Sequence, residues 1–382
     1  MLNRGMTATK KAVYLSGREA NSASAEIYLS EYSPYTGEHV RDIQLSKDGQ
    51  VAYYPCNDVL RDSKDNIIIS NLSLNASITP IILFLVDLSD GSLTEVARLN
   101  ASIKRVDHVG VYGDVANGNF TVFAVESNGA RVARWKVSNG VAASAQIRTF
   151  KAFYPASSGH FGIAPKIYPV SDSEFYIDGG STAWTLYSFD KPSAAVSSFS
   201  ENSGLAPAYV SDNGGRVFSL AENNYAVYNS TPSSVGSAQF QVAKTGTTPE
   251  FANYTALWKI PANGLGTVES TTCSAPVDAV AMSPITAHIY IYSPGNGLAA
   301  YRLTDTVATA VDDIFGNDTS ATLGVTVSGR TVRLDATVAS IRVYTTAGAL
   351  VAAVSDTDTV TLPAAGLYVV SAANRSVLVS IR

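Results

Sequence analysis

A short strand-and-turn unit recurs along this chain and constrains its fold more than any other feature. The clearest copies are residues 133–141, which read ARWKVSNGV, and residues 256–265, which read ALWKIPANGL. Looser copies lie at 27–37 and 82–91. Each copy alternates apolar and polar residues, the period of a half-buried strand, and then enters a turn that contains glycine. A repeated unit of this kind is typical of a radial or solenoidal array of β-strands.

Seven hairpins can be read from this unit, each joining a middle strand to an outer strand. Turns rich in Asp, Asn and Gly, with a short apolar strand ahead of them, precede several of the hairpins, and this order is that of a propeller blade. The hairpins span residues 13–32, 66–87, 119–137, 174–190, 216–229, 239–260 and 287–303. A β-sandwich would not repeat one unit in this way.

The sequence therefore predicts an all-β fold with a β-propeller over residues 10–304. Seven blades fit the hairpins best. The fifth and sixth hairpins are crowded and the first lacks an obvious inner strand, so six or eight blades stay open. Trp135 and Trp258 occupy the same place in their repeats, which favours packing within the blades over stacking on a sugar.

The pattern changes after the last hairpin. Residues 305–320 are mainly small and acidic and indicate a linker. Residues 321–382 alternate more densely, with six short strands, and predict a small antiparallel β-sandwich.

Two segments of this tail carry a family resemblance: residues 341–351, IRVYTTAGALV, and residues 360–370, VTLPAAGLYVV. A strand ending in an aromatic residue, a glycine turn, a Leu-Pro corner leading to tyrosine and a last strand at the chain end follow in order. The tail resembles the C-terminal sorting domain of the Bacteroidetes type IX (Por) secretion system. The propeller part resembles uncharacterised Bacteroidetes surface propellers in its general sequence character, without a diagnostic motif. The resemblance implies export to the extracellular space or the outer-membrane surface, with the secretion machinery as a partner of the tail. A generic β-sandwich module is the alternative.

Composition excludes several classes of function. The net charge is −5, without a basic cluster, which argues against a nucleic-acid partner. No window reaches the ~18 apolar residues of a membrane span. The first 11 residues lack the apolar core of a secretory signal, so we expect a fragment or mature form of a longer product. Two cysteines, Cys56 and Cys273, are too few for a disulfide scaffold, and we expect free thiols.

The chain contains no recognisable catalytic motif. It lacks a G-x-S-x-G elbow, an H-E-x-x-H pair, a P-loop and a G-x-G-x-x-G loop. Its four histidines stand alone, without a second ligand at metal spacing. We therefore predict no catalytic residue, metal ligand or cofactor. A carboxylate pair such as Asp58 with Asp107 could in principle serve a glycosidase, but nothing in the sequence selects it.

The best candidates for a ligand site are the loops that run from an outer strand to the next inner strand. In propellers these loops gather at one mouth of the central channel. Aromatic and polar residues in three of them predict a ligand-binding rim, although a loop packed on its own aromatics remains the alternative. The predicted residues are Tyr54, Arg105, Asp107, His108, Tyr154, His160 and Phe161.

The sequence thus favours a secreted or cell-surface binding protein without enzymatic activity, whose loop face meets a glycan or protein ligand. One alternative is a carbohydrate-active lyase or hydrolase with its site at the channel mouth. The other is a structural surface spacer without a ligand.

Overall fold

The computed structural model of the protein describes most of the chain. The described residues are 2–46, 54–153, 159–199, 205, 214–230, 239–246, 253–264, 276–294, 296–305, 323–346, 348–373 and 375–382. The chain divides into two compact units, Met1–Asp305 and Thr306–Arg382, called unit 1 and unit 2 below.

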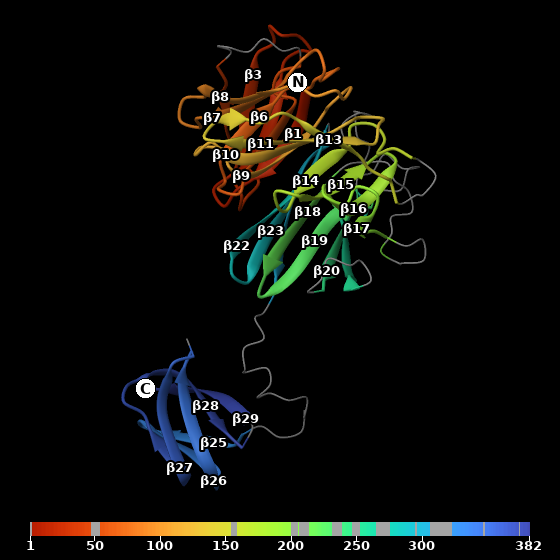
Figure 1. The fold of residues 1–382 in the computed structure, drawn as a ribbon. Helices are drawn as coiled ribbons and strands as arrows, with labels where there is room; N and C mark the ends of the chain where they lie inside the picture. Colours follow the sequence, from red (N-terminus) through yellow and green to blue (C-terminus); the bar gives the residue numbers. More distant parts are fainter. Residues whose placement is uncertain are drawn as a thin grey trace. The chain divides into compact units, whose positions relative to one another are not determined.

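Unit 1 consists of antiparallel sheets whose strands follow one another along the chain (Figure 1). Blade 1 contains β1 (Leu2–Ala8), β2 (Val13–Arg18), β3 (Ile27–Tyr32) and β4 (His39–Gln44), and blade 2 contains β5 (Asp58–Arg61), β6 (Ile67–Ser70), β7 (Ile81–Val86) and β8 (Leu93–Leu99). Blade 3 contains β9 (Val109–Asp114), β10 (Asn119–Val125), β11 (Arg131–Ser138), β12 (Val141–Ala142) and β13 (Gln146–Thr149).

The second half of unit 1 continues in the same way. Blade 4 contains β14 (Lys166–Pro169), β15 (Glu174–Gly179), β16 (Thr182–Ser188) and β17 (Ala195–Ser197). Blade 5 contains β18 (Gly215–Leu220), β19 (Asn223–Asn229), β20 (Phe240–Thr245) and β21 (Thr255–Ile260), and blade 6 contains β22 (Val277–Ser283), β23 (Thr286–Ser293) and β24 (Gly297–Thr304). The first strand of each blade lines a central channel, so the predicted all-β propeller is confirmed.

The described residues of unit 1 form six blades. The sequence favoured seven blades and left six or eight open, so the observed number is one of these alternatives. All seven predicted hairpins form. Hairpins 216–229 and 239–260 nevertheless share one sheet, because β19 also pairs with β20 over six residue pairs. β18 is therefore the inner strand of blade 5, where the sequence indicated a middle strand. Local alternation cannot distinguish these roles, since both are amphipathic strands.

Blade 1 has an inner strand that the sequence analysis missed. β1 pairs with β2 along its length and lies between the inner strands of blades 2 and 6, so the propeller begins before residue 10. The carboxylate of Asp278 on β22 accepts hydrogen bonds from the Ala8 amide at 2.9 Å and the Thr7 hydroxyl at 3.1 Å. Blades 6 and 1 thus meet directly, with each strand staying in its own blade. The segment LNRGMTA escaped notice because its polar residues obscure the alternation.

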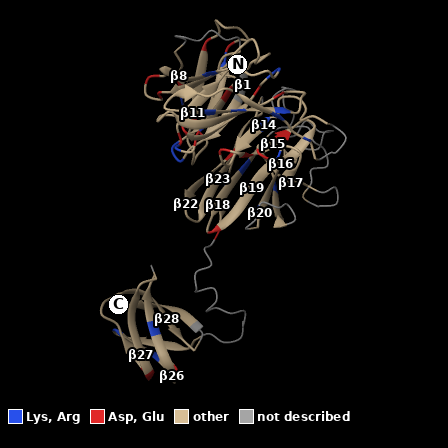
Figure 2. Ribbon diagram, viewed as in Figure 1, with Lys and Arg blue, Asp and Glu red and all other residues tan. Residues whose placement is uncertain are grey.

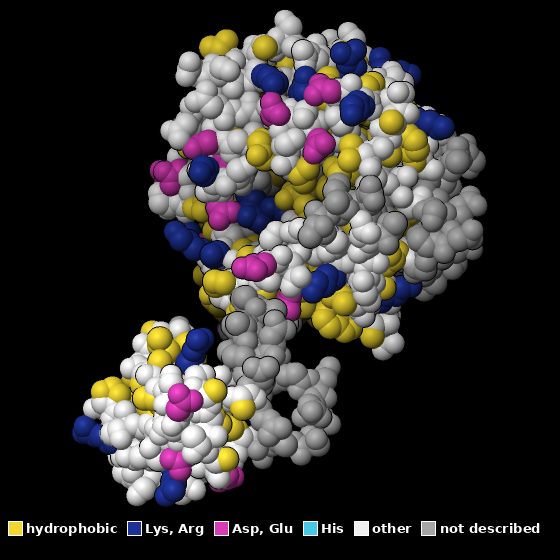
Figure 3. All heavy atoms as spheres, turned by 60° about the horizontal axis from the view of Figure 1, so that its bottom comes forward, with side chains coloured by type: hydrophobic (Ala, Val, Ile, Leu, Met, Phe, Trp, Pro, Cys, Tyr) yellow, Lys and Arg dark blue, Asp and Glu magenta, His cyan; other side chains and the backbone are white. Residues whose placement is uncertain are grey.

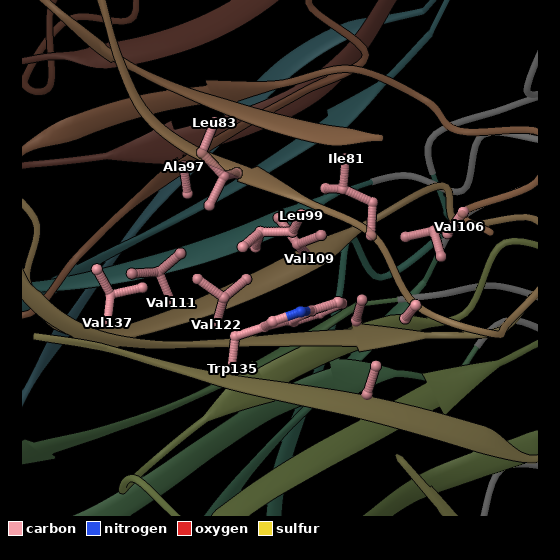
Figure 4. Packing of buried hydrophobic residues seen from close by; sticks show 14 of the residues in the cluster. Ile81, Leu83, Ala97, Leu99, Val106, Val109, Val111, Val122, Trp135 and Val137 are labelled. Carbon is pink, nitrogen blue, oxygen red and sulfur yellow. The ribbon is translucent and has the colours of Figure 1, made fainter. Parts of the chain in front are cut away.

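Neighbouring blades pack through apolar side chains on their facing surfaces. Between blades 2 and 3, Leu83 and Leu99 lie opposite Val122 and Trp135 (Figure 4). Trp135 is only 2% exposed, which agrees with the predicted packing role. Burial of a large apolar side chain contributes about 1.5–3 kcal/mol, so such contacts hold adjacent blades together.

Trp258 has a different environment from Trp135, contrary to the prediction from the repeat. It lies on β21, the last strand of blade 5, and is 53% exposed. β21 pairs with β20 alone among the described strands, so one of its edges is unpaired. The same place in the repeat therefore does not ensure burial.

Unit 2 is a small antiparallel β domain with its own core. Its strands are β25 (Val325–Ser328), β26 (Thr331–Thr345), β27 (Leu350–Thr361), β28 (Gly366–Ala372) and β29 (Arg375–Ile381). Two of the six short strands predicted for this tail are one continuous strand. This strand, β26, pairs with β25 through its first residues and with β28 through its last, while β27 follows its other edge.

The two features that carry the family resemblance are a turn and a corner of unit 2. Gly348 has a φ of 84° in the turn between β26 and β27, a conformation that favours glycine. The Tyr368 hydroxyl donates a hydrogen bond of 3.2 Å to the Ala364 carbonyl and ties the start of β28 to the preceding corner. The Tyr368 ring is buried in the core of the unit.

The described residues include no helix that is long and apolar enough to cross a membrane. Cys56 is a free, buried thiol, and burial raises its pKa to about 12. Cys273 lies outside the described residues.

Candidate functional site

The predicted rim residues lie where the inner strands begin, but most of them point into the protein. Arg105 and Asp107 form an ion pair, with Arg105 Nε 2.8 Å from Asp107 Oδ2. Asp107 is only 2% exposed, so its carboxylate is enclosed by this contact. Phe161 is completely buried and packs edge-on against Tyr187 at 5.7 Å between ring centroids. It belongs to the core between blades 3 and 4, which corrects its assignment to a ligand rim.

Tyr54 and His160 also contact other residues of the protein. The Tyr54 ring lies 5.5 Å from the guanidinium of the buried Arg18. His160 is half-buried, and its Nδ1 accepts a hydrogen bond of 3.1 Å from the Gly162 amide. Tyr154 lies outside the described residues. The structure thus brings Arg105 and Asp107 together, but the predicted residues that it describes do not surround an open pocket.

His108 belongs to a buried cluster inside the channel. Its Nδ1 lies 2.7 Å from Oδ2 of Asp58, the first residue of β5, and the Lys166 ammonium lies 3.6 Å from Oδ1 of the same carboxylate. Burial alone would raise the pKa of Asp58, but Lys166 and His108 outweigh it and hold the pKa below the usual range. Asp58 is therefore charged at neutral pH and poorly suited to donate a proton as a glycosidase acid would.

A close approach of backbone allows this cluster to form. β1 passes Asp58 so tightly that a Cβ at Gly5 would lie 2.4 Å from Asp58 Oδ1. Only glycine fits there, because any side chain would have to displace the carboxylate or the β5 backbone. The channel is consequently narrow, and the cavity enclosed between the inner strands measures about 80 Å³.

A second ionic cluster lies further along the channel, where the inner strands end. The Asp278 carboxylate lies 3.0 Å from Arg216 Nε and 3.5 Å from Arg61 Nε. Arg61 also donates to Asp65 at 2.6 Å and to the Ala279 carbonyl at 3.2 Å. Burial alone would raise the pKa of Asp278, but Arg216 and Arg61 keep it below the ordinary value. None of these residues was predicted from the sequence as part of a site.

The channel opens at this end into a cavity of about 450 Å³, called the turn mouth below. It lies where the inner strands turn back into the middle strands, at the opposite end from the predicted rim. Polar residues from the β1–β2 and β5–β6 turns line it together with side chains from four other inner strands. Its main side chains are Lys10, Arg61, Asp62, Asp65, Tyr112, Tyr168, Arg216 and Phe218. A volume of this size is within the range of small-molecule sites.

Both cationic and aromatic groups face the turn mouth. The Arg216 guanidinium lies 4.3 Å from the centroid of the Tyr168 ring, and the exposed Tyr112 of β9 also lines the cavity. The space-filling view shows charged side chains beside hydrophobic surface on unit 1 (Figure 3), and most of the ribbon of unit 1 carries neither Lys or Arg nor Asp or Glu (Figure 2). This mixture can bind a ligand that has both polar groups and a flat apolar face.

A second cavity of about 300 Å³ adjoins the turn mouth between blades 4 and 5. Val170, Val217 and Phe218 line both cavities, so the two meet at this wall. Beyond the wall lie Glu174 and Tyr225, whose ring stacks on Phe218 at 5.5 Å and 18°. The two cavities together form an elongated surface.

A local signal could have identified the turn mouth. Arg61, Arg216 and Asp278 each stand in a short strand that is otherwise largely apolar. A charged residue in such a strand is buried only with a partner, so each predicts an ion pair. The sequence does not say which residues pair, because Arg61 and Asp278 are 217 positions apart.

The described residues hold no cluster of three or more His, Cys, Asp or Glu side chains suited to a metal ion.

No family model matches the chain, and no curated protein matches it. Solved structures resemble it at low identity. A mutant of the Aleuria aurantia lectin in complex with Fucα1-6GlcNAc has 11% identity and a TM-score of 0.46, over 81% of this chain and 97% of that one. The RRP9 WD40 repeats have 10% identity and a TM-score of 0.46, over 79% and 94%. A putative 6-phosphogluconolactonase from Bacteroides fragilis has 11% identity and a TM-score of 0.42, over 99% and 97%. The propeller assignment stands on the sheets of this chain, and the ligands named for those proteins are theirs alone.

Proposed function

We propose that this protein is a non-enzymatic binding propeller whose ligand occupies the turn mouth. The observation that carries the proposal is the cavity of about 450 Å³, with two arginines already held in place by the buried Asp278. Groups fixed before binding lose little conformational entropy when the ligand arrives. This site replaces the predicted loop rim, where Asp107 and Phe161 are buried.

The carboxylates near the channel favour binding over hydrolysis. A glycosidase needs one carboxyl group that can give up a proton and a second that acts as base or nucleophile. Asp58 and Asp278 are both buried beside cations that lower their pKa, so neither holds a proton at neutral pH. Asp62 accepts four hydrogen bonds, from Asn66 and from three backbone amides, and serves to shape its turn.

Filling the turn mouth tests this proposal directly. Ala281 lines the cavity without taking part in the ionic cluster, so Ala281→Trp should occupy the space and abolish binding on glycan and peptide arrays. Ala143→Trp, at an exposed loop of blade 3, is the matched control and should bind like the unmodified protein. A reducing-sugar assay runs in parallel.

Three outcomes would overturn the proposal. Binding that Ala281→Trp leaves unchanged would place the ligand elsewhere. Release of a sugar product that Ala281→Trp abolishes would identify a carbohydrate-active enzyme. No binding to any array member would favour the structural spacer.

We further propose that unit 2 directs the protein to the outer-membrane surface or beyond. The support is the resemblance of residues 341–351 and 360–370 to the type IX sorting domain, together with the fact that unit 2 folds as a compact body of its own. Such a tail can be recognised without disturbing a ligand site in unit 1.

The test is secretion in a Bacteroidetes host that has an intact type IX system. A form carrying a signal peptide should appear outside the outer membrane, and the same form without residues 306–382 should remain in the periplasm. The same two forms in a host without the system should both stay in the periplasm. Equal secretion of both forms in the intact host would make unit 2 an ordinary β module.

A further inference from the structure

Arg216 is the one arginine of the turn mouth whose terminal nitrogens are open. Its Nε lies 3.0 Å from Asp278, and its guanidinium lies against the Tyr168 ring at 4.3 Å. Neither terminal nitrogen makes a hydrogen bond to any residue that the structure describes. Arg61 differs, because Asp278, Asp65 and the Ala279 carbonyl engage all three of its nitrogens. Arg216 therefore presents a fixed, bidentate hydrogen-bond donor to the cavity.

The chemistry that suits this donor is a carboxylate. A guanidinium and a carboxylate form two parallel hydrogen bonds, and this geometry is stronger and more specific than a single contact. The Arg216 side chain is only 16% exposed, so the bonds would form in a partly dehydrated environment where they gain strength. The stack on Tyr168 and the contact with Asp278 fix the plane in which a ligand carboxylate must lie.

The charge balance of the mouth argues against a highly charged polyanion. Three cationic side chains line the cavity, Lys10, Arg61 and Arg216, together with two acidic ones, Asp62 and Asp65. The buried Asp278, which pairs with both arginines, supplies a third negative charge. The cavity thus has no net positive field to attract a polyanion. Selectivity must come from the local position of Arg216, which can accommodate one acidic group.

The remaining walls suit a sugar ring with hydroxyl groups. Asp65 is 45% exposed, and only its Oδ1 is engaged by Arg61, so its other oxygen can accept from a ligand hydroxyl. Tyr112 and Phe218 provide aromatic surface on two sides of the cavity. The second cavity continues past Phe218 to Glu174 and Tyr225. A second sugar residue would reach this extension.

We propose that the turn mouth binds an acidic oligosaccharide, with the carboxylate of one uronic or sialic acid residue on Arg216 and the next sugar over Phe218. This inference rests on the proposed binding function of the turn mouth. An acidic peptide could also place a carboxylate on Arg216. It would use the hydroxyl acceptor at Asp65 and the extension past Phe218 less well.

The test compares ligands that differ only in charge. Binding of trigalacturonate, 3′-sialyllactose and an acidic peptide is measured by calorimetry, alongside methyl-esterified trigalacturonate and neutral lactose. At least one acidic sugar should bind, and its ester or neutral counterpart should bind about 10- to 100-fold more weakly, the loss expected for hydrogen bonds to a charged group.

Two variants assign the difference to Arg216. Arg216→Gln should lower the affinity for the acidic sugar about 10- to 100-fold, so that the preference for the acidic over the neutral sugar is largely lost. Arg216→Lys keeps the charge beside Asp278 and protects the fold, but it lacks the bidentate donor and should also lose most of the affinity. Circular dichroism confirms that both variants are folded.

The outcomes separate this inference from the proposed function. If acidic and neutral sugars bind with equal affinity and Ala281→Trp abolishes this binding, recognition of a ligand carboxylate by Arg216 is refuted. The turn mouth would still be the binding site. Binding of the acidic peptide alone would show that the ligand is not a sugar. Acidic-sugar binding that survives both Arg216 variants would also overturn the inference. If neither the acidic sugars nor the peptide bind, this inference fails, and the glycan and peptide arrays decide the proposed function separately.

Discussion

Removing the charge of Asp278 should destabilise unit 1 more than any other conservative change in the channel. The Asp278 carboxylate is 4% exposed, accepts hydrogen bonds from the Ala8 and Ala279 amides, and neutralises Arg61 and Arg216. Asp278→Asn keeps the shape of the side chain but leaves both arginines without this partner. Because β22 and β1 meet at Asp278, the loss falls on the contact that closes the ring.

The size of the effect follows from the burial of the partners. Breaking a buried ion pair by removing one charge costs about 3–5 kcal/mol. Arg61 retains Asp65, and the two arginine side chains are 13% and 16% exposed, so some hydration remains. We therefore expect the lower end, about 3 kcal/mol in the free energy of unfolding. For a domain of this size that corresponds to a fall in Tm of about 5 °C.

The pH dependence provides a second test with a defined sign. Burial would raise the pKa of Asp278, but Arg216 and Arg61 hold it below the ordinary value of 3.8. A carboxylate with a lowered folded-state pKa stabilises the protein above the unfolded-state pKa, and this stabilisation is lost as the pH falls through the folded value. The stability difference between the unmodified protein and Asp278→Asn should therefore be complete at pH 7 and shrink below pH ~4.

Urea unfolding followed by tryptophan fluorescence at pH 7 and pH 3 measures both effects. Asp172→Asn is the control, because Asp172 pairs with Lys136 at 2.8 Å while both side chains are more than half exposed. Such surface pairs contribute about 0–1 kcal/mol. The reasoning is refuted if Asp278→Asn costs less than about 1 kcal/mol at pH 7, or if its effect grows as the pH falls.

Three further predictions concern packing and reactivity. Trp135→Ala should cost about 3–5 kcal/mol because it empties the core between blades 2 and 3, whereas Trp258→Ala, at a side chain 53% exposed, should cost less than about 1 kcal/mol. Denaturant titration of the two variants measures the difference, and equal losses would contradict the assigned environments. Tyr368→Phe should lower the stability of unit 2 by about 1 kcal/mol through loss of the bond to Ala364. Calorimetry should show this in one transition only, and a shift in both would indicate coupled units. Cys56, whose pKa burial raises to about 12, should resist iodoacetamide at pH 8 until the protein unfolds. Mass spectrometry of the labelled peptides tests this, and rapid labelling of the folded protein would show that the thiol is accessible.

Much of the fold could be predicted because the strands and hairpins are local features. The alternation in residues 119–137 and the turn near Asn128, whose φ is 55°, lie within about twenty positions of one another. Their pairing follows from strand period and turn chemistry alone. The change of pattern after Leu303 likewise comes close to the end of unit 1 at Asp305.

The grouping of hairpins into blades could not be predicted in the same way. Residues 216–229 and 239–260 carry the same alternation as two separate blades would, and only the pairing of β19 with β20 joins them. The inner strand of blade 1 shows no clear alternation, and its place depends on Asp278, about 270 positions away. Such lateral pairings depend on the complete ring, not on any local pattern.

The sequence by itself determined the all-β class and the hairpins. Tertiary structure alone decided that the cavity lined by described residues lies at the turn end of the channel. Asp107 and Phe161 are turned inward because Arg105 and Tyr187 complete their burial. Arg216 is left with an open donor because its one acidic partner, Asp278, is shared with Arg61. The physical reason is that a buried charge takes its partner from whichever strand the closed ring places beside it, and that neighbour is far away in the chain.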